Sequence, residues 1–132
     1  MDTLPEVPEV RFRMRIRRGN DIALGPGKVD LLEAIHEHGS ISAAARHLGM
    51  SYRRAWLLVD QLNRCLEGPA TVSSHGGSAG GSCLLTPVGL AVIKLYRDIE
   101  KTAHASCVTQ IGQLTALMRS PDASEAIESN KS

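Results

Sequence analysis

The sequence predicts a mainly α-helical fold with small β-hairpins, on the strength of three observations. The chain of 132 residues is 42% hydrophobic but only 3% aromatic, so its core must consist largely of Leu, Ile, Val and Ala, which favours helices over a β-sandwich. Two short helical patterns joined by a tight turn occupy residues 39–62. A Gly-rich hairpin and a long helical pattern follow them. In this order, these parts predict a winged helix-turn-helix with a long C-terminal dimerisation helix.

The length of the chain indicates a single domain with one modest core. We expect a disordered N-terminus at 1–9, a winged-helix DNA-binding and dimerisation domain at 10–118, and a disordered tail at 119–132 that is rich in Ser, Asp and Glu. The acidic, Pro-interrupted start MDTLPEVPEV is unlike a signal peptide, and no apolar run is long enough to span a membrane. A cytoplasmic protein is therefore expected.

Residues 10–16 alternate between apolar side chains and arginines, which is the period-two pattern of a half-buried strand. A turn at 19–21 and a short return strand at 22–24 complete a hairpin. The apolar face carries Val10, Phe12, Met14 and Ile16 and needs a lid, for which the long C-terminal helix of this or another subunit is the natural candidate. The arginine face either stays solvated, contacts phosphates, or pairs with acidic residues of a partner subunit.

Three helices are predicted between residues 28 and 66. The first ends at Gly39, the second is capped by Ser40 or Ser42 and ends at Gly49, and Ser51 caps the third. Apolar residues at spacings of three and four continue the inward face of the third helix to about residue 66. Trp56 lies beside that face near the helix start, where it packs under the turn or contacts DNA.

A hairpin with strands at 70–73 and 83–86 follows a stop at Gly68-Pro69. Its tip, SHGGSAGGS, has four glycines in nine residues, and such a tip can approach another backbone closely. We therefore predict a wing that contacts a phosphate strand or the minor groove through His75, Gly76 and Gly77. The alternative is a disordered loop.

The last element opens with a Thr86 cap and with Pro87 in the first helical turn, and its helical pattern continues through Met118. A helix of this length overhangs a small domain, so its apolar stripe is expected to form a dimer seam. The predicted dimer contacts are Leu90, Ile93, Tyr96, Ile99 and Leu114 of this helix with Val10, Phe12 and Met14 of the first strand.

The net charge of +1 conceals two basic segments. Residues 11–18 hold five arginines and no acid, and residues 40–64 hold four arginines against one aspartate. A phosphate backbone responds to such local charge rather than to the total. Because basic and polar residues open the third helix, we predict that it enters the major groove of double-stranded DNA. The predicted contacts are Ser51, Tyr52, Arg53 and Arg54 on that helix and Ser42 and Arg46 on the helix before it.

No enzyme, cofactor or metal site is expected. Cys65, Cys83 and Cys107 have no metal-ligand spacing and are expected to be reduced, small apolar residues, with a redox-sensing thiol as the alternative. His36 and His38, two positions apart, point to different faces of a helix. No nucleophile is paired with a base at a recognisable spacing.

Several motifs in fixed order resemble the DNA-binding domain of the ModE family, a bacterial winged-helix group of molybdate-responsive regulators related to LysR-type domains. They are GSIS before an Ala-rich helix, SYRRAW, the region of Asn63, GGSAGG and LLTPVGLAVIKLY, and the resemblance covers about residues 10–117. It implies a homodimer in which the first strands and the long last helix meet, while the two recognition helices enter successive major grooves.

The chain also departs from the pattern of that family. Arg54 is an added basic residue, Leu57 replaces an expected polar residue, and the predicted wing tip has His75 instead of Arg or Lys. The sequence shows no molybdate-binding region after the last helix, so we expect no molybdate binding by the usual route of the family and leave open an unknown effector or partner protein.

Two functions are compatible with these residues. The first is a dimeric, sequence-specific regulator that binds DNA. The second is a winged-helix module that binds proteins and has lost specific DNA binding, which the near-neutral charge, the weakly basic wing and Leu57 favour.

Overall fold

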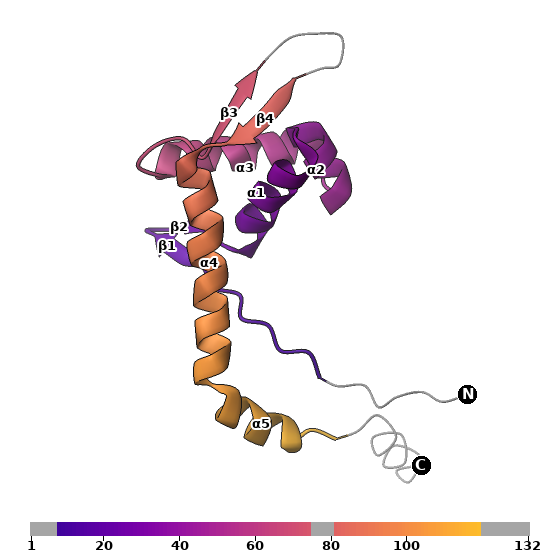
Figure 1. The fold of residues 1–132 in the computed structure, drawn as a ribbon, viewed down its shortest axis with the longest axis vertical. Helices are drawn as coiled ribbons and strands as arrows, with labels where there is room; N and C mark the ends of the chain where they lie inside the picture. The colour runs from indigo at the N-terminus through magenta and orange to yellow at the C-terminus, as the bar shows by residue number, and fades with distance from the viewer. Residues whose placement is uncertain (1–7, 75–80, 120–132) are drawn as a thin grey trace, which may run out of the picture. The chain divides into compact units, whose positions relative to one another are not determined.

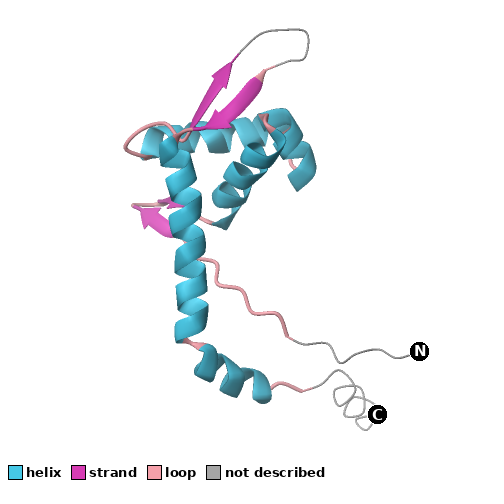
Figure 2. Cartoon of the chain, in the orientation of Figure 1, coloured by secondary structure: helices cyan, strands magenta, loops and turns pink. Residues whose placement is uncertain are grey.

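The computed structural model describes residues 8–74 and 81–119. Figure 1 and Figure 2 show a mainly helical chain with two small antiparallel hairpins. The chain divides into two compact units, one of residues 13–100 and one formed by the segments on either side of it. The first unit is a winged helix-turn-helix, as predicted. The boundaries 1–9, 10–118 and 119–132 stay predictions, and most of both terminal segments lies outside the described residues.

The N-terminal hairpin is shorter than the sequence predicts. Strand β1 (Ile16–Arg18) pairs antiparallel with β2 (Asp21–Leu24) around a turn in which Gly19 has a φ of 63°. The strand predicted at 10–16 is wrong, because residues 10–15 pair with no strand of the described chain. Their side chains still alternate, with Val10, Phe12 and Met14 half-buried and the arginines exposed. The alternation therefore reports partial burial and not a hydrogen-bonded ladder.

Three helices form the centre of this unit: α1 (Pro26–His38), α2 (Ile41–Leu48) and α3 (Tyr52–Cys65). Helix α1 begins two residues earlier than expected, since Pro26 suits the first turn of a helix. Ser40 caps α2 and Ser51 caps α3, each accepting a backbone N–H at 3.1 Å. Gly39 and Gly49 end α1 and α2 in the left-handed conformation that glycine adopts without strain.

We define the wing as strands β3 (Thr71–Ser74) and β4 (Ser82–Leu85). Strand β3 lies one residue later than predicted, and β4 lies one residue earlier. Asn63 of α3 holds its base. The Asn63 Oδ1 accepts the backbone N–H groups of Ala70 and Thr71 at 2.8 and 3.2 Å, and its Nδ2 donates to the Thr71 hydroxyl. Helix α3 and the wing are thereby fixed to each other.

The core is built from aliphatic side chains, as the composition predicts. One cluster joins Leu31 and Ile35 of α1 to α2, α3 and Cys83 of β4, and a second joins Leu32 to Leu62 and Ala70. The three cysteines are free, with Cys83 buried and the other two half-buried. This matches the expectation of small apolar side chains.

The long last helix is interrupted. Helix α4 (Pro87–Ser106) stops before Cys107, which is the N-cap of α5 (Val108–Ala116). One continuous helix to Met118 was thus a wrong prediction. Ser106, Cys107, Val108 and Thr109 have low helix propensity, which accounts for a break at this point. The predicted Thr86 cap is confirmed, since its hydroxyl accepts the backbone N–H of Gly89 at 3.2 Å.

Helix α4 is tied to α1 by a charged network. Arg97 donates to Asp30 at 2.9 Å and to Glu100 at 2.7 Å, and it makes two hydrogen bonds to Glu33. The hydrogen bonds to Glu33 are the main reason that the pKa of Arg97 lies above its ordinary value. In residues 8–74 and 81–119, no helix combines the length and hydropathy that crossing a membrane requires.

Candidate nucleic-acid interface

The first turn of α3 stands free of the core. Ser51, Tyr52, Arg53 and Arg54 are all exposed, and Ala55 is the first buried residue of the helix. The Ser51 Oγ accepts the N–H of Arg54, which leaves its own O–H free to donate. The structure therefore brings together the four polar residues that the sequence assigns to this turn.

Two apolar side chains extend the exposed surface of α3. Trp56 is 47% exposed and Leu57 is 42% exposed. Of the two interpretations of Trp56, packing under the turn is wrong, since the described residues leave about half of this side chain uncovered. Together with Tyr52, which is 56% exposed, these residues offer flat and apolar contact area beside the arginines.

The arginines near the start of α3 are not neutralised within the chain. Among the described residues, no ion pair or side-chain hydrogen bond is made by Arg46, Arg53 or Arg54. By contrast, Arg64 at the other end of α3 pairs with Asp60 at 2.7 Å. Guanidinium groups without an internal partner keep their donors available for phosphate or guanine.

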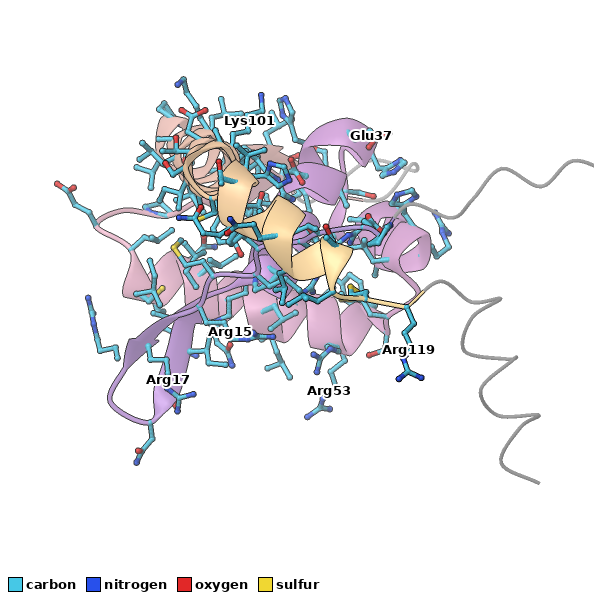
Figure 3. The ribbon with its side chains drawn as sticks, turned by 90° about the horizontal axis from the view of Figure 1, so that it is seen from below. Arg15, Arg17, Glu37, Arg53, Lys101 and Arg119 are labelled. Carbon is cyan, nitrogen blue, oxygen red and sulfur yellow. The ribbon has the colours of Figure 1, made fainter. Side chains whose placement is uncertain are left out.

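The N-terminal hairpin and the residues just before it add further arginines on the same side as α3. In Figure 3, Arg15, Arg17 and Arg53 lie along one edge, opposite Glu37. We call this the basic face and define it by Arg13, Arg15, Arg17, Arg18, Arg53 and Arg54.

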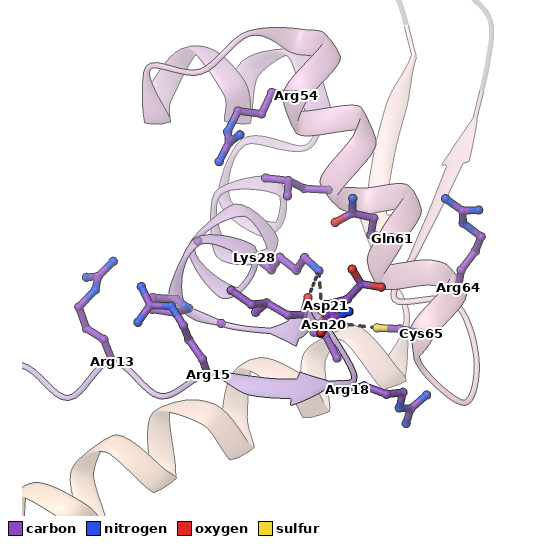
Figure 4. A pocket seen from close by; sticks show the side chains of 16 residues that line it. Arg13, Arg15, Arg18, Asn20, Asp21, Lys28, Arg54, Gln61, Arg64 and Cys65 are labelled. Atoms are coloured by element: carbon purple, nitrogen blue, oxygen red, sulfur yellow. Dashed lines mark hydrogen bonds between the residues drawn. The ribbon is translucent and has the colours of Figure 1, made fainter.

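An open cavity of about 960 Å³ lies within the basic face, between the hairpin, the start of α1 and α3. Figure 4 shows Arg13 and Arg15 on one side of it, Arg54 above and Arg64 on the other side. Lys28 lies between them with its side chain buried, and its Nζ donates to the carbonyl oxygens of Ile22 and Ala23 at 2.7 and 3.3 Å. The charge of Lys28 thus fixes the hairpin to α1 and adds to the positive potential of the cavity.

Sequence reasoning missed Lys28 because its role depends on the carbonyl groups of β2, which no local pattern reveals. The predicted contacts on α2, Ser42 and Arg46, are both exposed. The predicted wing contacts His75, Gly76 and Gly77 lie outside the described residues.

Only some of the predicted dimer contacts are exposed, and others pack within the chain. Tyr96 is buried within its own chain, where its hydroxyl donates to the carbonyl of Met14 at 2.9 Å, and Ile93 packs against the second core cluster. Phe12 meets the ring of His104 edge-on, with 6.2 Å between centroids. Leu90, Ile99 and Leu114 are exposed. Leu95, which is 61% exposed and four residues before Ile99, was missed although this spacing places both on one helical face.

Comparison with known proteins finds similarity to a family over the central segment. Residues 27–90 match the family described as bacterial regulatory helix-turn-helix protein, lysR family. This segment includes α1, α2, α3, the wing and the start of α4.

Curated relatives match a similar part of the chain. The chain is 47% identical over 77 residues to the molybdenum-pterin-binding protein MopB of Rhodobacter capsulatus, covering 58% of this chain and 28% of MopB. It is 37% identical over 92 residues to the molybdenum transport protein ModE of Azotobacter vinelandii, covering 68% of this chain and 34% of that protein. It is also 37% identical over 71 residues to the DNA-binding transcriptional dual regulator ModE of Escherichia coli K12, covering 54% and 27%. The chain thus spans about a third of the length of these relatives.

Among solved structures, ArgP from Mycobacterium tuberculosis aligns with a TM-score of 0.47 and 17% identity, over 66% of this chain and 30% of ArgP.

Proposed function

Since residues 27–90 match the model of the bacterial LysR-type helix-turn-helix family, we propose that the chain binds double-stranded DNA and regulates transcription. One observation carries this proposal: the exposed first turn of α3 presents two arginines with no partner among the described residues. The ModE protein of Escherichia coli is named as a DNA-binding regulator, and we propose the same activity for this chain.

In this proposal α3 enters the major groove with its first turn leading. Arg53 and Arg54 then donate to base edges or phosphates, and the hydroxyl groups of Ser51 and Tyr52 donate beside them. Ser42 and Arg46 of α2 contact the backbone that flanks the groove. The arginines of the N-terminal hairpin lie on the same face and extend the phosphate contacts along the DNA.

We further propose that the active form is a homodimer. In the unit of residues 13–100, Leu95 and Ile99 form an exposed apolar pair on α4 with no cover among the described residues. Exposed pairs of this kind on one helical face suit a helix–helix contact between two copies. A dimer would present two recognition helices to a site with two-fold symmetry.

A second candidate function is a protein-binding module. The exposure of Tyr52, Trp56 and Leu57 on α3 supports it, because aromatic and apolar side chains beside arginines are enriched at the centres of protein interfaces. The two candidates differ in their response to salt. DNA binding through phosphates weakens steeply, with a slope of about 0.9 per phosphate contact.

The test is an anisotropy titration of the full chain with DNA from upstream of its own gene and of neighbouring genes, at two salt concentrations. We expect competitor-resistant binding to one fragment. Arg53→Ala should weaken it by about 1–3 kcal/mol. Lys94→Ala removes a cation that pairs with Asp98 on α4 at 2.9 Å, and this control should bind as the wild type does.

Binding that is equally strong for every fragment would argue against sequence specificity. Unchanged affinity in Arg53→Ala would remove Arg53 from the interface. Absence of binding at both salt concentrations would favour the protein-binding module.

A further inference from the structure

Three side chains of metal-binding type meet where α1 and α2 end. Glu37 and His38 are the last two residues of α1, and His47 lies one residue before the end of α2. One ligand atom from each lies within 4.8 Å of those of the other two. The imidazole rings of His38 and His47 are 4.6 Å apart between centroids. Residues of two helices thus converge because Gly39 turns the chain back on itself with a φ of 80°.

The ligand atoms of this cluster are not used elsewhere. Among the described residues, Glu37, His38 and His47 make no hydrogen bond or ion pair, and the ring contact between the two histidines is the interaction that they share. All three side chains are exposed and can rotate. A cluster of free donors that faces water is open to a dissolved ion.

The electrostatic setting favours a cation. The carboxyl ends of α1 and α2 both lie at the cluster, and each carries the negative end of a helix dipole. The Glu37 carboxylate adds a full negative charge. Arg46 precedes His47, and among the described residues it forms no ion pair with the Glu37 carboxylate.

We propose that Glu37, His38 and His47 bind a divalent first-row transition metal, with zinc as the reference ion. Two neutral imidazoles and a carboxylate form an N₂O donor set of the kind that Zn²⁺ accepts, and water would complete a tetrahedral site. Ligand distances of about 2.1 Å would place the three donor atoms roughly 3.4 Å apart. The present separations of at most 4.8 Å exceed that value by little more than 1 Å, and all three side chains are exposed.

Such an ion would tie the end of α1 to the end of α2, the first helix of the helix-turn-helix. The carbonyl of Gly39, next to His38, accepts the backbone N–H of Cys83 at 2.9 Å, so the same junction also anchors strand β4 of the wing. Glu37 lies opposite Arg15, Arg17 and Arg53 in Figure 3. The metal would therefore stiffen the support of the recognition helix without touching the basic face.

The test is calorimetric titration of the full chain, free of any histidine tag, with zinc chloride. We expect one zinc ion per chain, and His38→Gln and His47→Gln should each weaken binding at least tenfold. His36→Gln is the matched control, because His36 is exposed on α1 but is not part of the cluster, and it should bind as the wild type does.

A second measurement identifies the ligands and needs no variant. Cobalt bound at this site should give weak visible bands and no cobalt–thiolate charge-transfer band, and zinc should protect His38 and His47 from diethylpyrocarbonate. Protection of other histidines, a thiolate band, or binding that survives both substitutions would overturn the assignment. So would the absence of saturable zinc binding.

Discussion

Among the glycines that the structure describes, Gly89 leaves the least room for an added side chain. A Cβ added at Gly89 would lie 2.3 Å from the carbonyl oxygen of Ala70, at the point where α4 starts against the base of the wing. Backbone atoms cannot rotate away as the end of a side chain can. We therefore expect Gly89→Ala to lower the free energy of unfolding by about 1–3 kcal/mol, as overpacking does, measured by urea denaturation.

Gly112 provides the matched control for this substitution. It lies inside α5, and a Cβ there meets no atom within 4 Å. Gly112→Ala should leave stability unchanged or raise it by up to about 1 kcal/mol, because alanine favours a helix interior over glycine. A loss of stability in Gly112→Ala would contradict the proposed clash at Gly89. Unchanged stability in Gly89→Ala would contradict it as well.

Tyr96 makes stability depend on pH at the alkaline end. Burial raises the pKa of its phenol above the ordinary value of 10.0, and the Glu100 carboxylate adds to the shift. Because the folded state holds the proton more tightly, the contribution is complete below about pH 10 and is lost as pH rises further. Tyr96→Phe should cost about 1 kcal/mol at pH 7, through loss of the hydrogen bond to Met14, and should reduce the alkaline loss. Thermal unfolding of both proteins between pH 7 and 11 checks this.

At single residues, the sequence predicts caps well and exposure poorly. Ser51 and Thr86 cap their helices as expected, because a cap depends on residues within one turn of it. Trp56 was expected either to pack under the turn or to contact DNA, and its 47% exposure contradicts the first alternative. Helical spacing gives the direction of a side chain, but whether another element covers that direction is decided by the tertiary structure.

At the level of elements, helices were predicted more reliably than strands. The three central helices are present with their capping residues, since periodicity and caps are local signals. The strand at 10–16 failed because a strand requires a partner, and alternation cannot show whether one exists. The break at Cys107 was missed because apolar spacing continues through it.

The exposed apolar pair on helix α4 allows a test of the proposed dimer contact. The double variant Leu95→Glu/Ile99→Glu should be monomeric, because it places charges on the exposed apolar pair that we assign to the dimer contact. Sedimentation equilibrium checks the mass. Val72→Glu, at a site on β3 that is 53% exposed, is the control and should stay dimeric. A dimeric double variant would exclude this face, and a monomeric wild type would exclude the dimer.

In the whole molecule, the distribution of charge matters more than its sum. A net charge of +1 suggests little affinity for DNA, yet the hairpin and the start of α3 place their arginines on one face. The sequence revealed the two basic segments, and the resemblance to ModE proteins is confirmed by the curated relatives. That both segments share one face could not be predicted, since it depends on how the hairpin packs against α1.

Arg15, just before the hairpin, and Arg17, within it, allow a test of this shared face. Arg15→Gln/Arg17→Gln should weaken DNA binding and lower the slope of affinity against salt by about two, since each lost phosphate contact removes about 0.9. The measurement is affinity at several salt concentrations. Lys94→Gln, at an exposed lysine on α4, should keep the wild-type slope. An unchanged slope in the double variant would show that the hairpin faces solvent in the complex.

The exposure of residues near the start of α3 also affects how easily the sequence can change there without loss of the fold. Tyr52, Arg53, Trp56 and Leu57 are exposed, while the fold is maintained by Ala55, Val59 and Leu62 on the other side of the same helix and by the Asn63 clamp further along. The positions that we propose for recognition are therefore separate from those that maintain the fold, although both lie in one short segment. A gene library randomised at the four exposed codons should yield mostly folded proteins, from which selection could recover new binding preferences on an unchanged scaffold.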